Sequence, residues 1–496
     1  MSRSHVCKRY ANVIFAAAIL LSVGVMVSLC FNNSVWFDEA YSTFMARQSY
    51  WGIIEQNLAD VHPPLYYFVL KLVTSVFGYN LLVMKLVSVA GVAATMVLGA
   101  TLVRRRFGDR AGLLFILLLL CGPCMLSECA VIVRMYSWAM FFVTASGLLA
   151  YEIYEAPTKA KWIFFVLLSV AGMYTHTYAL IVIGFVYLLL LIAMIRNQKD
   201  QLLKWVLCAA ATFVLYLPWF FVLLRQVGMV SGNYWIAPLS LSSFAEYARF
   251  LFMSSNPVAV KALIITAMAG YGLALAAVVF AVWCVRGAFW KKRKMDRAAL
   301  LALVVFLLPA VLGIGFSLAV RPVFIARYLL PGIGLFWLFF AIEASRLKKG
   351  WLAVFLCCVL LNGALSYCQT FQEEYVTKTD EAVSYLKGEV GEEDVFLTNL
   401  LQLGEQGGPL AYYFPEQESW CYQDGEFFKH YTNGGGTDVA VSLDQVEGVK
   451  GTFWYLCNPK REPETAWFTD RGYTVTKEES TGIDLYSFDV YRIAKE

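Results

Sequence analysis

Residues 36–42 read WFDEAYS and residues 60–67 read DVHPPLYY, and both stretches place ionisable side chains beside long apolar runs. The first stretch holds Asp38 and Glu39, and the second holds Asp60 and His62. Ionisable groups beside membrane-like segments are costly in free energy, so they usually have a function. The nature of the surrounding runs therefore decides the fold and the chemistry open to these four residues.

The apolar runs have the length and composition of transmembrane helices. The chain has 496 residues, of which 59% are hydrophobic and 15% are charged, whereas soluble domains hold roughly 25% charged residues. A run of about 20 apolar residues crosses a bilayer as a helix. We predict about eleven such helices, at about residues 11–31, 80–103, 111–128, 135–153, 161–177, 178–195, 203–223, 259–285, 298–319, 329–345 and 351–368.

The charges divide the chain into two parts. Residues 1–369 carry 30 Lys and Arg against 12 Asp and Glu, and residues 370–496 carry 10 against 24, which gives net charges of +18 and −14. We predict an all-α polytopic membrane domain over 1–369 and a small soluble α/β domain over 370–496. In the second part, TKTDEAVSYLKGEV has the pattern of a helix, and NGGG at 433–436 that of a turn. Strand patterns are DVFLTN, DVAVSL, GTFWYLCN and DLYSFDVYRI.

Basic clusters set the expected topology. RRRFGDR at 104–110, VRGAFWKKRKMDR at 285–297 and the other clusters fall on one side when the helices alternate, and basic residues prefer the cytoplasmic side. The first run lacks a small-residue cleavage pattern, so we predict that it is retained. We therefore expect a multi-pass protein of the cell membrane with a cytoplasmic N-terminus. The soluble domain and two long loops, about 32–79 and 224–258, would lie outside.

The ionisable residues near the expected outer face combine carboxylates with cations. They are Asp38, Glu39, Asp60, His62, Lys85, Glu128, Arg134, His176, Arg321 and Arg327. Such a mixture suits a reaction in which a carboxylate takes a proton while a cation stabilises a phosphate leaving group.

Structural explanations stay open for each of these residues. Asp38 and Glu39 would also fit a hydrated loop just past a helix end, and Asp60 and His62 would fit caps of a helix that begins near Pro64. Lys85, Arg134 and Arg327 could be interfacial cations with extended side chains, and His176 could pack in an aromatic belt. His62 with a carboxylate could also ligate a metal, but a single histidine is weak support.

The twelve cysteines provide little evidence for a redox function. CGPC at 121–124 lacks the strand and helix that flank redox motifs. Cys421 and Cys457 could form a disulfide in the soluble domain, and the sequence leaves this open.

The motifs as an ordered set resemble a known family. WFDEAYS, DVHPPLYY, a basic residue in the next helix, RMYS, YTHTYAL and RYLLP resemble bacterial membrane glycosyltransferases related to protein O-mannosyltransferases and to aminoarabinose transferases of lipid A. The resemblance covers about residues 1–345 and implies the GT-C fold of glycosyltransferase family 39. It implies that a sugar passes from a polyprenyl-phosphate carrier to a hydroxyl of a protein, lipid or glycan, usually with inversion. Hexosyl and pentosyl groups both fit.

The resemblance also implies roles for individual residues. Asp38 would be the general base, and Glu39 and Asp60 would complete the catalytic set. The substrate-binding residues would be His62, Lys85, Arg134, His176, Arg327 and Tyr328. Lys85, where many relatives have Arg, and Arg327 would contact the donor phosphate. Polar residues that often precede the arginine of RMYS are replaced here by Val131, Ile132 and Val133. No nucleotide or metal is required, and a divalent cation stays open.

Two other classes of protein compete with this interpretation. A transporter or lipid flippase would place charges near the bilayer midplane and would show internal repeats. Here the charges cluster at the expected outer ends of helices. A structural protein of the cell envelope would use the soluble domain as a binding module.

Overall fold

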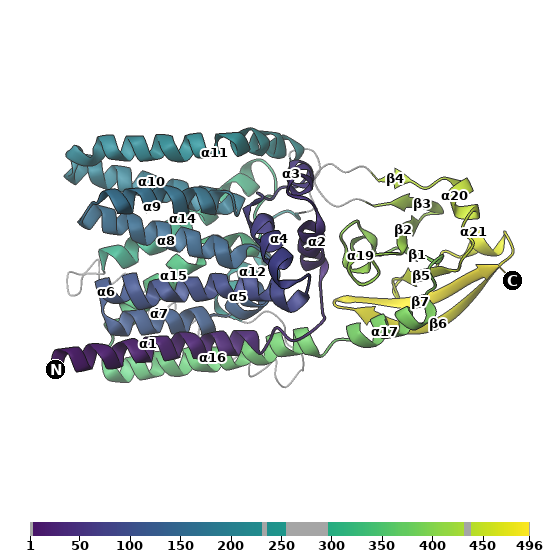
Figure 1. The fold of residues 1–496 in the computed structure, drawn as a ribbon, viewed down its shortest axis with the longest axis horizontal. Coiled ribbons are helices and arrows are strands. Elements are labelled where there is room, and N and C mark those ends of the chain that lie inside the picture. The colour runs from purple at the N-terminus through teal and green to yellow at the C-terminus, as the bar shows by residue number, and fades with distance from the viewer. Residues whose placement is uncertain (1–2, 231–235, 254–295, 431–437, 496) are drawn as a thin grey trace. The chain divides into compact units, whose positions relative to one another are not determined.

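The computed structural model describes residues 3–230, 236–253, 296–430 and 438–495 (Figure 1). The chain forms two compact units. The first contains Met1–Cys30, His62–Tyr66 and Lys85–Phe371, and the second contains Phe31–Val61, Tyr67–Met84 and Gln372–Glu496. The boundary that we predicted at 369/370 lies within one helix, α16, which runs from Lys349 to Tyr375.

The first unit is helical. Its described elements are α1 (Arg3–Val27), α5 (Leu81–Leu98), η1 (Gly99–Val103), α6 (Arg104–Phe107), α7 (Asp109–Cys121), η2 (Leu126–Ala130), α8 (Tyr136–Glu155), α9 (Lys159–Met173), α10 (Thr177–Asn197), η3 (Lys199–Gln201), α11 (Leu202–Val230), α12 (Leu241–Phe252), α14 (Arg297–Ala319), η4 (Ala326–Gly332), α15 (Ile333–Ser345) and α16. The helix α15 is apolar all round, and 89% of its membrane-length segment is buried. It therefore forms the centre of the helical unit, packed against α7, α8 and α14.

Seven of the described helical segments are long and apolar enough to cross a membrane. They are Tyr10–Val27, Leu81–Phe107, Thr177–Asn197, Lys199–Gly228, Arg297–Ala319, Ala326–Ser345 and Lys349–Glu389. The expected spans at 111–128, 135–153 and 161–177 are helices α7, α8 and α9 of 13, 20 and 15 residues, which are not among those seven. The span expected at 259–285 lies outside the described residues. A multi-pass membrane protein is thus confirmed, whereas the number eleven stays a prediction.

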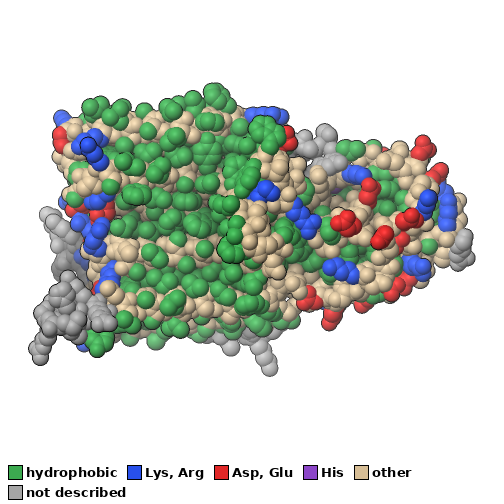
Figure 2. All heavy atoms as spheres, in the orientation of Figure 1, with side chains coloured by type: hydrophobic (Ala, Val, Ile, Leu, Met, Phe, Trp, Pro, Cys, Tyr) green, Lys and Arg blue, Asp and Glu red, His purple; other side chains and the backbone are tan. Residues whose placement is uncertain are grey.

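The surface of the helical unit agrees with a membrane environment. Figure 2 shows hydrophobic side chains covering the helices, with Lys and Arg gathered at the end where α6 lies. At that end Arg104 pairs with Asp109 at 2.6 Å, and Glu152 pairs with both Arg105 and Lys161. These partly exposed pairs contribute little to stability. They show that this end of the bundle is polar.

The second unit combines helices from residues 37–77 with a sheet from the C-terminal part. Its first helices are α2 (Phe37–Arg47), α3 (Tyr50–Ala59) and, from Tyr67 onward, α4 (Leu65–Phe77). The later helices are α17 (Thr379–Glu389), α18 (Leu401–Gly404), α19 (Pro409–Tyr413), α20 (Leu443–Glu447) and α21 (Ala466–Thr469). The strands are β1 (Val395–Thr398), β2 (Glu418–Gln423), β3 (Glu426–Lys429), β4 (Val439–Ala440), β5 (Phe453–Cys457), β6 (Tyr473–Ile483) and β7 (Tyr486–Lys495).

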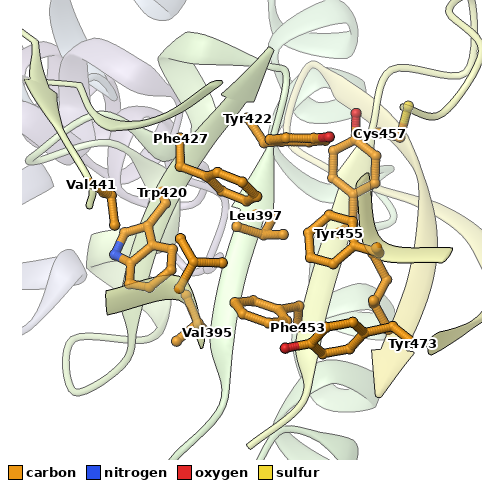
Figure 3. Packing of buried hydrophobic residues seen from close by; sticks show 13 residues of the cluster. Val395, Leu397, Trp420, Tyr422, Phe427, Val441, Phe453, Tyr455, Cys457 and Tyr473 are labelled. Atoms are coloured by element: carbon orange, nitrogen blue, oxygen red, sulfur yellow. The ribbon is translucent and has the colours of Figure 1, made fainter. Parts of the chain in front are cut away.

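The strands form one mixed sheet in the order β4-β3-β2-β1-β5-β7-β6. Strand β1 pairs in parallel with β2 and β5, and the other pairs are antiparallel. All four residues of β1 are buried, as expected for a central strand covered on both faces. Figure 3 shows its Val395 and Leu397 among the aromatic rings of Trp420, Phe453 and Tyr455. The predicted α/β domain is therefore confirmed; the turn expected at 433–436 lies outside the described residues.

The suggested disulfide between Cys421 and Cys457 is wrong. Both residues are buried free cysteines. Cys421 lies on β2 and Cys457 on β5, with β1 between the two strands. Two strand spacings amount to about 9.6 Å, and a disulfide needs Cα atoms within roughly 7 Å. Instead the Nδ2 atom of Asn399 donates a hydrogen bond to Sγ of Cys457.

Candidate active site

Asp38 and Glu39 lie in the first turn of α2, not in the loop that we expected. The backbone N–H of Trp36 donates to the Glu39 carboxylate at 3.5 Å, and the partial positive charge of the helix N-terminus favours both acids. Glu39 is 2% exposed, whereas Asp38 is half-buried. The buried Glu39 therefore supports the start of the helix, whereas the carboxylate of Asp38 stays partly exposed.

Asp60 ends a helix and does not begin one. It is the C-cap of α3 and is 1% exposed, and its Oδ1 accepts from the N–H of Val61 at 2.6 Å. The next helix, α4, begins at Leu65 directly after Pro63 and Pro64. The double proline thus starts α4 as expected, but Asp60 belongs to the helix before it. All three candidate carboxylates lie in the second unit.

Four of the candidate substrate-binding residues come together in the first unit. They are His62, Arg134, His176 and Tyr328, which we call the histidine–arginine cluster. Nη2 of Arg134 lies 3.1 Å from Nε2 of His62. The ring centroids of His62 and His176 are 6.4 Å apart, and those of His176 and Tyr328 are 6.1 Å apart. Residues far apart in the sequence therefore build one group around a guanidinium, in which Arg134 and His176 are buried and His62 and Tyr328 are partly exposed.

His176 presents a hydrogen-bond donor inside this cluster. It is the N-cap of α10 and is 3% exposed, and its Nδ1 accepts from the N–H of Tyr178 at 3.0 Å. A neutral imidazole with an accepting Nδ1 carries its proton on Nε2. Nε2 of His176 is buried and has no hydrogen-bond partner within the described part of the chain. Since such a donor usually finds a partner, the atom fits an acceptor oxygen of a bound ligand.

Two tyrosines that we did not predict, Tyr136 and Tyr178, pack against the rings of the cluster. The ring of Tyr136 lies 5.6 Å from that of His176, and the ring of Tyr178 stacks on Tyr328 at 4.4 Å. Oη of Tyr178 donates to the carbonyl of Val323 at 3.0 Å, which ties α10 to the segment before η4. Both tyrosines stand inside the motifs RMYS and YTHTYAL, so the sequence signal was present but we used only its charged members.

Lys85 and Arg327 lie on elements next to the cluster. On α5, Oγ of Ser88 donates to the carbonyls of Ile132 and Arg134, and a Cβ at Gly91 would come 2.5 Å from Oγ of Ser137. Small residues thus let α5 approach the start of α8 closely. Lys85 is fully buried one helical turn before Ser88. Arg327 lies on η4, one residue before Tyr328, and its Nε is 4.0 Å from the Glu128 carboxylate.

One protein-family model matches part of the chain. Residues 61–221 match the family model described as dolichyl-phosphate-mannose-protein mannosyltransferase. This segment is about a third of the chain and includes His62, Lys85, Arg134 and His176. No curated protein matches the sequence.

Two solved structures match almost the whole chain. ArnT from Cupriavidus metallidurans in the apo state shares 12% sequence identity over 97% of both chains, with a TM-score of 0.62. ArnT from the same organism bound to undecaprenyl phosphate shares 13% identity over 97% of both chains, with a TM-score of 0.58. The GT-C fold that the motifs led us to expect is therefore confirmed.

Within the described ranges, no group of three or more His, Cys, Asp and Glu side chains could hold a metal ion. Nε2 of His62 faces the guanidinium of Arg134, and a metal-binding role of His62 stays a prediction.

Proposed function

We propose that this chain is a membrane glycosyltransferase that moves a sugar from a polyprenyl-phosphate carrier to a hydroxyl acceptor on the outer face of the membrane. The observation that carries the proposal is the histidine–arginine cluster, which combines a 2% exposed guanidinium with a histidine donor inside a GT-C fold. One of the two similar structures binds undecaprenyl phosphate, which is such a carrier.

The cations supply the donor side of the reaction. Lys85, Arg134 and Arg327 are proposed to contact the phosphate of the carrier, with the Nε2–H of His176 as a further donor. A guanidinium matches phosphate oxygens with two parallel hydrogen bonds. In a buried group such donors are worth more than in water, because they stabilise the charge that develops on the leaving phosphate without reorganisation.

The carboxylates supply the acceptor side. The acceptor oxygen attacks the anomeric carbon, the bond from that carbon to the phosphate oxygen breaks, and the phosphate keeps the electron pair. Asp38 is proposed to take the proton of the acceptor hydroxyl. A single displacement of this kind inverts the anomeric centre. Glu39 and Asp60 are proposed to hold the local backbone in place, as their burial and hydrogen bonds suggest.

The orientation follows from the charges. We propose a cytoplasmic N-terminus and an outer location for residues 370–496, because the basic clusters prefer the cytoplasm. The acceptor would then be a protein, lipid or glycan of the cell envelope.

The decisive experiment is a transfer assay with purified protein and polyprenyl-phosphate sugars with radiolabelled hexoses and pentoses, with and without a chelator. We expect loss of label from the carrier only in the presence of an extract that holds acceptors. The Asp38→Asn variant is the matched control, because it retains the shape of the side chain. Movement of intact labelled carrier across a vesicle membrane, with no loss of sugar, would instead indicate a flippase.

A further inference from the structure

The segment that leads into α2 is held by residues of the C-terminal part. Oη of Tyr413, at the end of α19, donates to the carbonyl of Asn33 at 2.5 Å and accepts from the N–H of Val35 at 3.0 Å. One phenol hydroxyl therefore binds two backbone groups, the carbonyl of Asn33 and the N–H of Val35. Tyr413 is buried, and burial raises the pKa of its hydroxyl, so the group stays protonated and able to donate at any physiological pH.

A second contact holds the residue between these two. Oγ of Ser34 donates to Oδ1 of Asp484 at 3.1 Å. Asp484 lies in the turn between β6 and β7 with φ of 52°, a left-handed conformation that needs support in a residue other than glycine. Its N–H donates to Oγ1 of Thr379 at the start of α17. The turn that holds Ser34 is thus itself hydrogen-bonded to the start of α17.

Further contacts flank this stretch. The N–H of Phe31 donates to Oη of Tyr375, and Nδ2 of Asn33 donates to Asp380 at 3.2 Å. Beyond Asp38, the ring of Phe44 covers Gly407, where a Cβ would come 3.1 Å from the ring. The backbone is therefore fixed on both sides of Asp38, and all of these residues belong to one compact unit.

We propose that Tyr413 and Asp484 are positioning residues, which set the place of Asp38 by holding residues 33–35 of the chain. This inference rests on the proposed function, because it takes Asp38 as the general base. It gives the C-terminal part a role in the reaction, because residues of this part hold the segment that leads into α2, the helix of Asp38. A displacement of about 1 Å of a catalytic group is enough to cost roughly 10²-fold in rate.

The test uses Tyr413→Phe in the full-length protein, which removes one oxygen and keeps the ring. We expect the turnover number to fall at least about tenfold, because the positioning of the base is lost. The KM for the polyprenyl-phosphate sugar should stay within about twofold, because the proposed donor-binding residues are not those that Tyr413 holds. The control is Tyr491→Phe on β7, whose ring packs beside Tyr455 elsewhere in the sheet. It should leave turnover unchanged.

A double variant separates positioning from general damage. In the Asp38→Asn background, measured in single-turnover assays, Tyr413→Phe should cause no further loss, since residues that act as a unit are not additive. If Tyr413→Phe does not fold, Ser34→Ala replaces it and should give a smaller loss with the same pattern.

Each result supports or overturns the inference. Unchanged turnover in Tyr413→Phe, or an equal loss with and without Asp38, would overturn it and leave the proposed function standing. A wild-type protein that transfers no sugar would instead remove the proposed function and, with it, the role of Tyr413.

Discussion

Nη2 of Arg134 and Nε2 of His62 lie 3.1 Å apart in the helical unit. A guanidinium only donates hydrogen bonds, so Nε2 of His62 accepts and the proton of its neutral ring is on Nδ1. His62 therefore holds the buried guanidinium in one orientation. Ser88 fixes the backbone of the same arginine from α5. The guanidinium and the backbone of Arg134 are thus each held by a hydrogen bond from a different part of the chain.

Replacing Arg134 by lysine should weaken donor binding. Lysine keeps the charge but loses the planar fork that matches phosphate, and the loss of one charged hydrogen bond is worth about tenfold in affinity or more. We expect the KM for the donor to rise about tenfold in Arg134→Lys. The control is Arg346→Lys, because Arg346 forms a separate ion pair with Glu343. An unchanged donor KM in both variants would exclude Arg134 from the donor site.

Arg327 should contribute to the same step. It lies on η4 directly before Tyr328 of the histidine–arginine cluster, so its guanidinium stands beside the proposed phosphate-binding residues. Arg327→Ala should weaken binding of the carrier by about tenfold with the fold intact, and Arg327→Lys should recover only part. Binding can be followed with labelled polyprenyl phosphate in detergent. Arg249→Ala, on the exposed face of α12, serves as the control, and equal effects at both positions would argue for nonspecific electrostatics.

Asp38→Asn should abolish most of the activity. General-base help is worth about 10²–10⁴ in rate, so turnover should fall at least about 10²-fold while donor binding persists. Glu39→Gln should cost less in turnover and more in stability, because Glu39 is the buried member of the pair. Near-normal turnover in Asp38→Asn, together with complete loss in Glu39→Gln or Asp60→Asn, would show that the base is another carboxylate.

Stability should depend on pH through His430. Its Nε2 lies 2.9 Å from Glu405 and its Nδ1 lies 2.5 Å from Asp438. The hydrogen bonds to these carboxylates raise the pKa of His430 above its ordinary value. The protonated form therefore stabilises the fold below pH about 6.5, and this contribution is lost as the pH rises through the raised pKa.

The melting temperature of the purified protein should accordingly be higher at pH 6 than at pH 8.5. In His430→Gln this difference should shrink, because the titrating group is gone. Asp489, whose pKa is lowered by hydrogen bonds from Lys477 and Ser480, changes charge only in acid and does not contribute in this range. The same pH dependence in wild-type and variant would assign the effect to other groups.

Cysteine labelling should show on which side of the membrane the sheet domain and the basic cluster of α6 each lie. Leu485 and Arg105 are exposed positions near the sheet turn and in the basic cluster of α6. In a background with Cys357 and Cys368 replaced by serine, a membrane-impermeant maleimide should label Leu485→Cys in intact cells. It should label Arg105→Cys only after lysis. The opposite pattern would reverse the proposed orientation.

The sequence predicted well where one physical signal was strong. Long apolar runs locate helices such as α10 and α14 within a few residues, because burial in lipid depends on length and composition alone. Buried strands β1 and β5 and the amphipathic α17 also stand where their patterns indicated. Strand β6 was missed because its sequence, YTVTKEESTGI, is polar and largely exposed, so it has no alternation to read.

The site was only partly accessible to the same reasoning. Helix α2 was not predicted because Trp36 is a poor N-cap residue and the acids resemble a loop. His62, Arg134, His176 and Tyr328 were selected from motifs, and nothing in their spacing indicates that they meet. Tyr413 and Asp484 gave no signal at all, because their importance depends on pairing with residues 33–35, far away in the sequence.

The unit that holds Asp38 is assembled from the beginning and the end of the chain. A ribosome makes residues 31–61 well before residues 372–496. The first helices can enter the membrane and pack while the partners of Asn33, Ser34 and Val35 are still missing. Contacts between such distant segments form late, because a long loop must close first. If these contacts position Asp38 as we propose, membrane insertion would precede catalytic competence, and a chain that stops short of the sheet would be inserted but inactive.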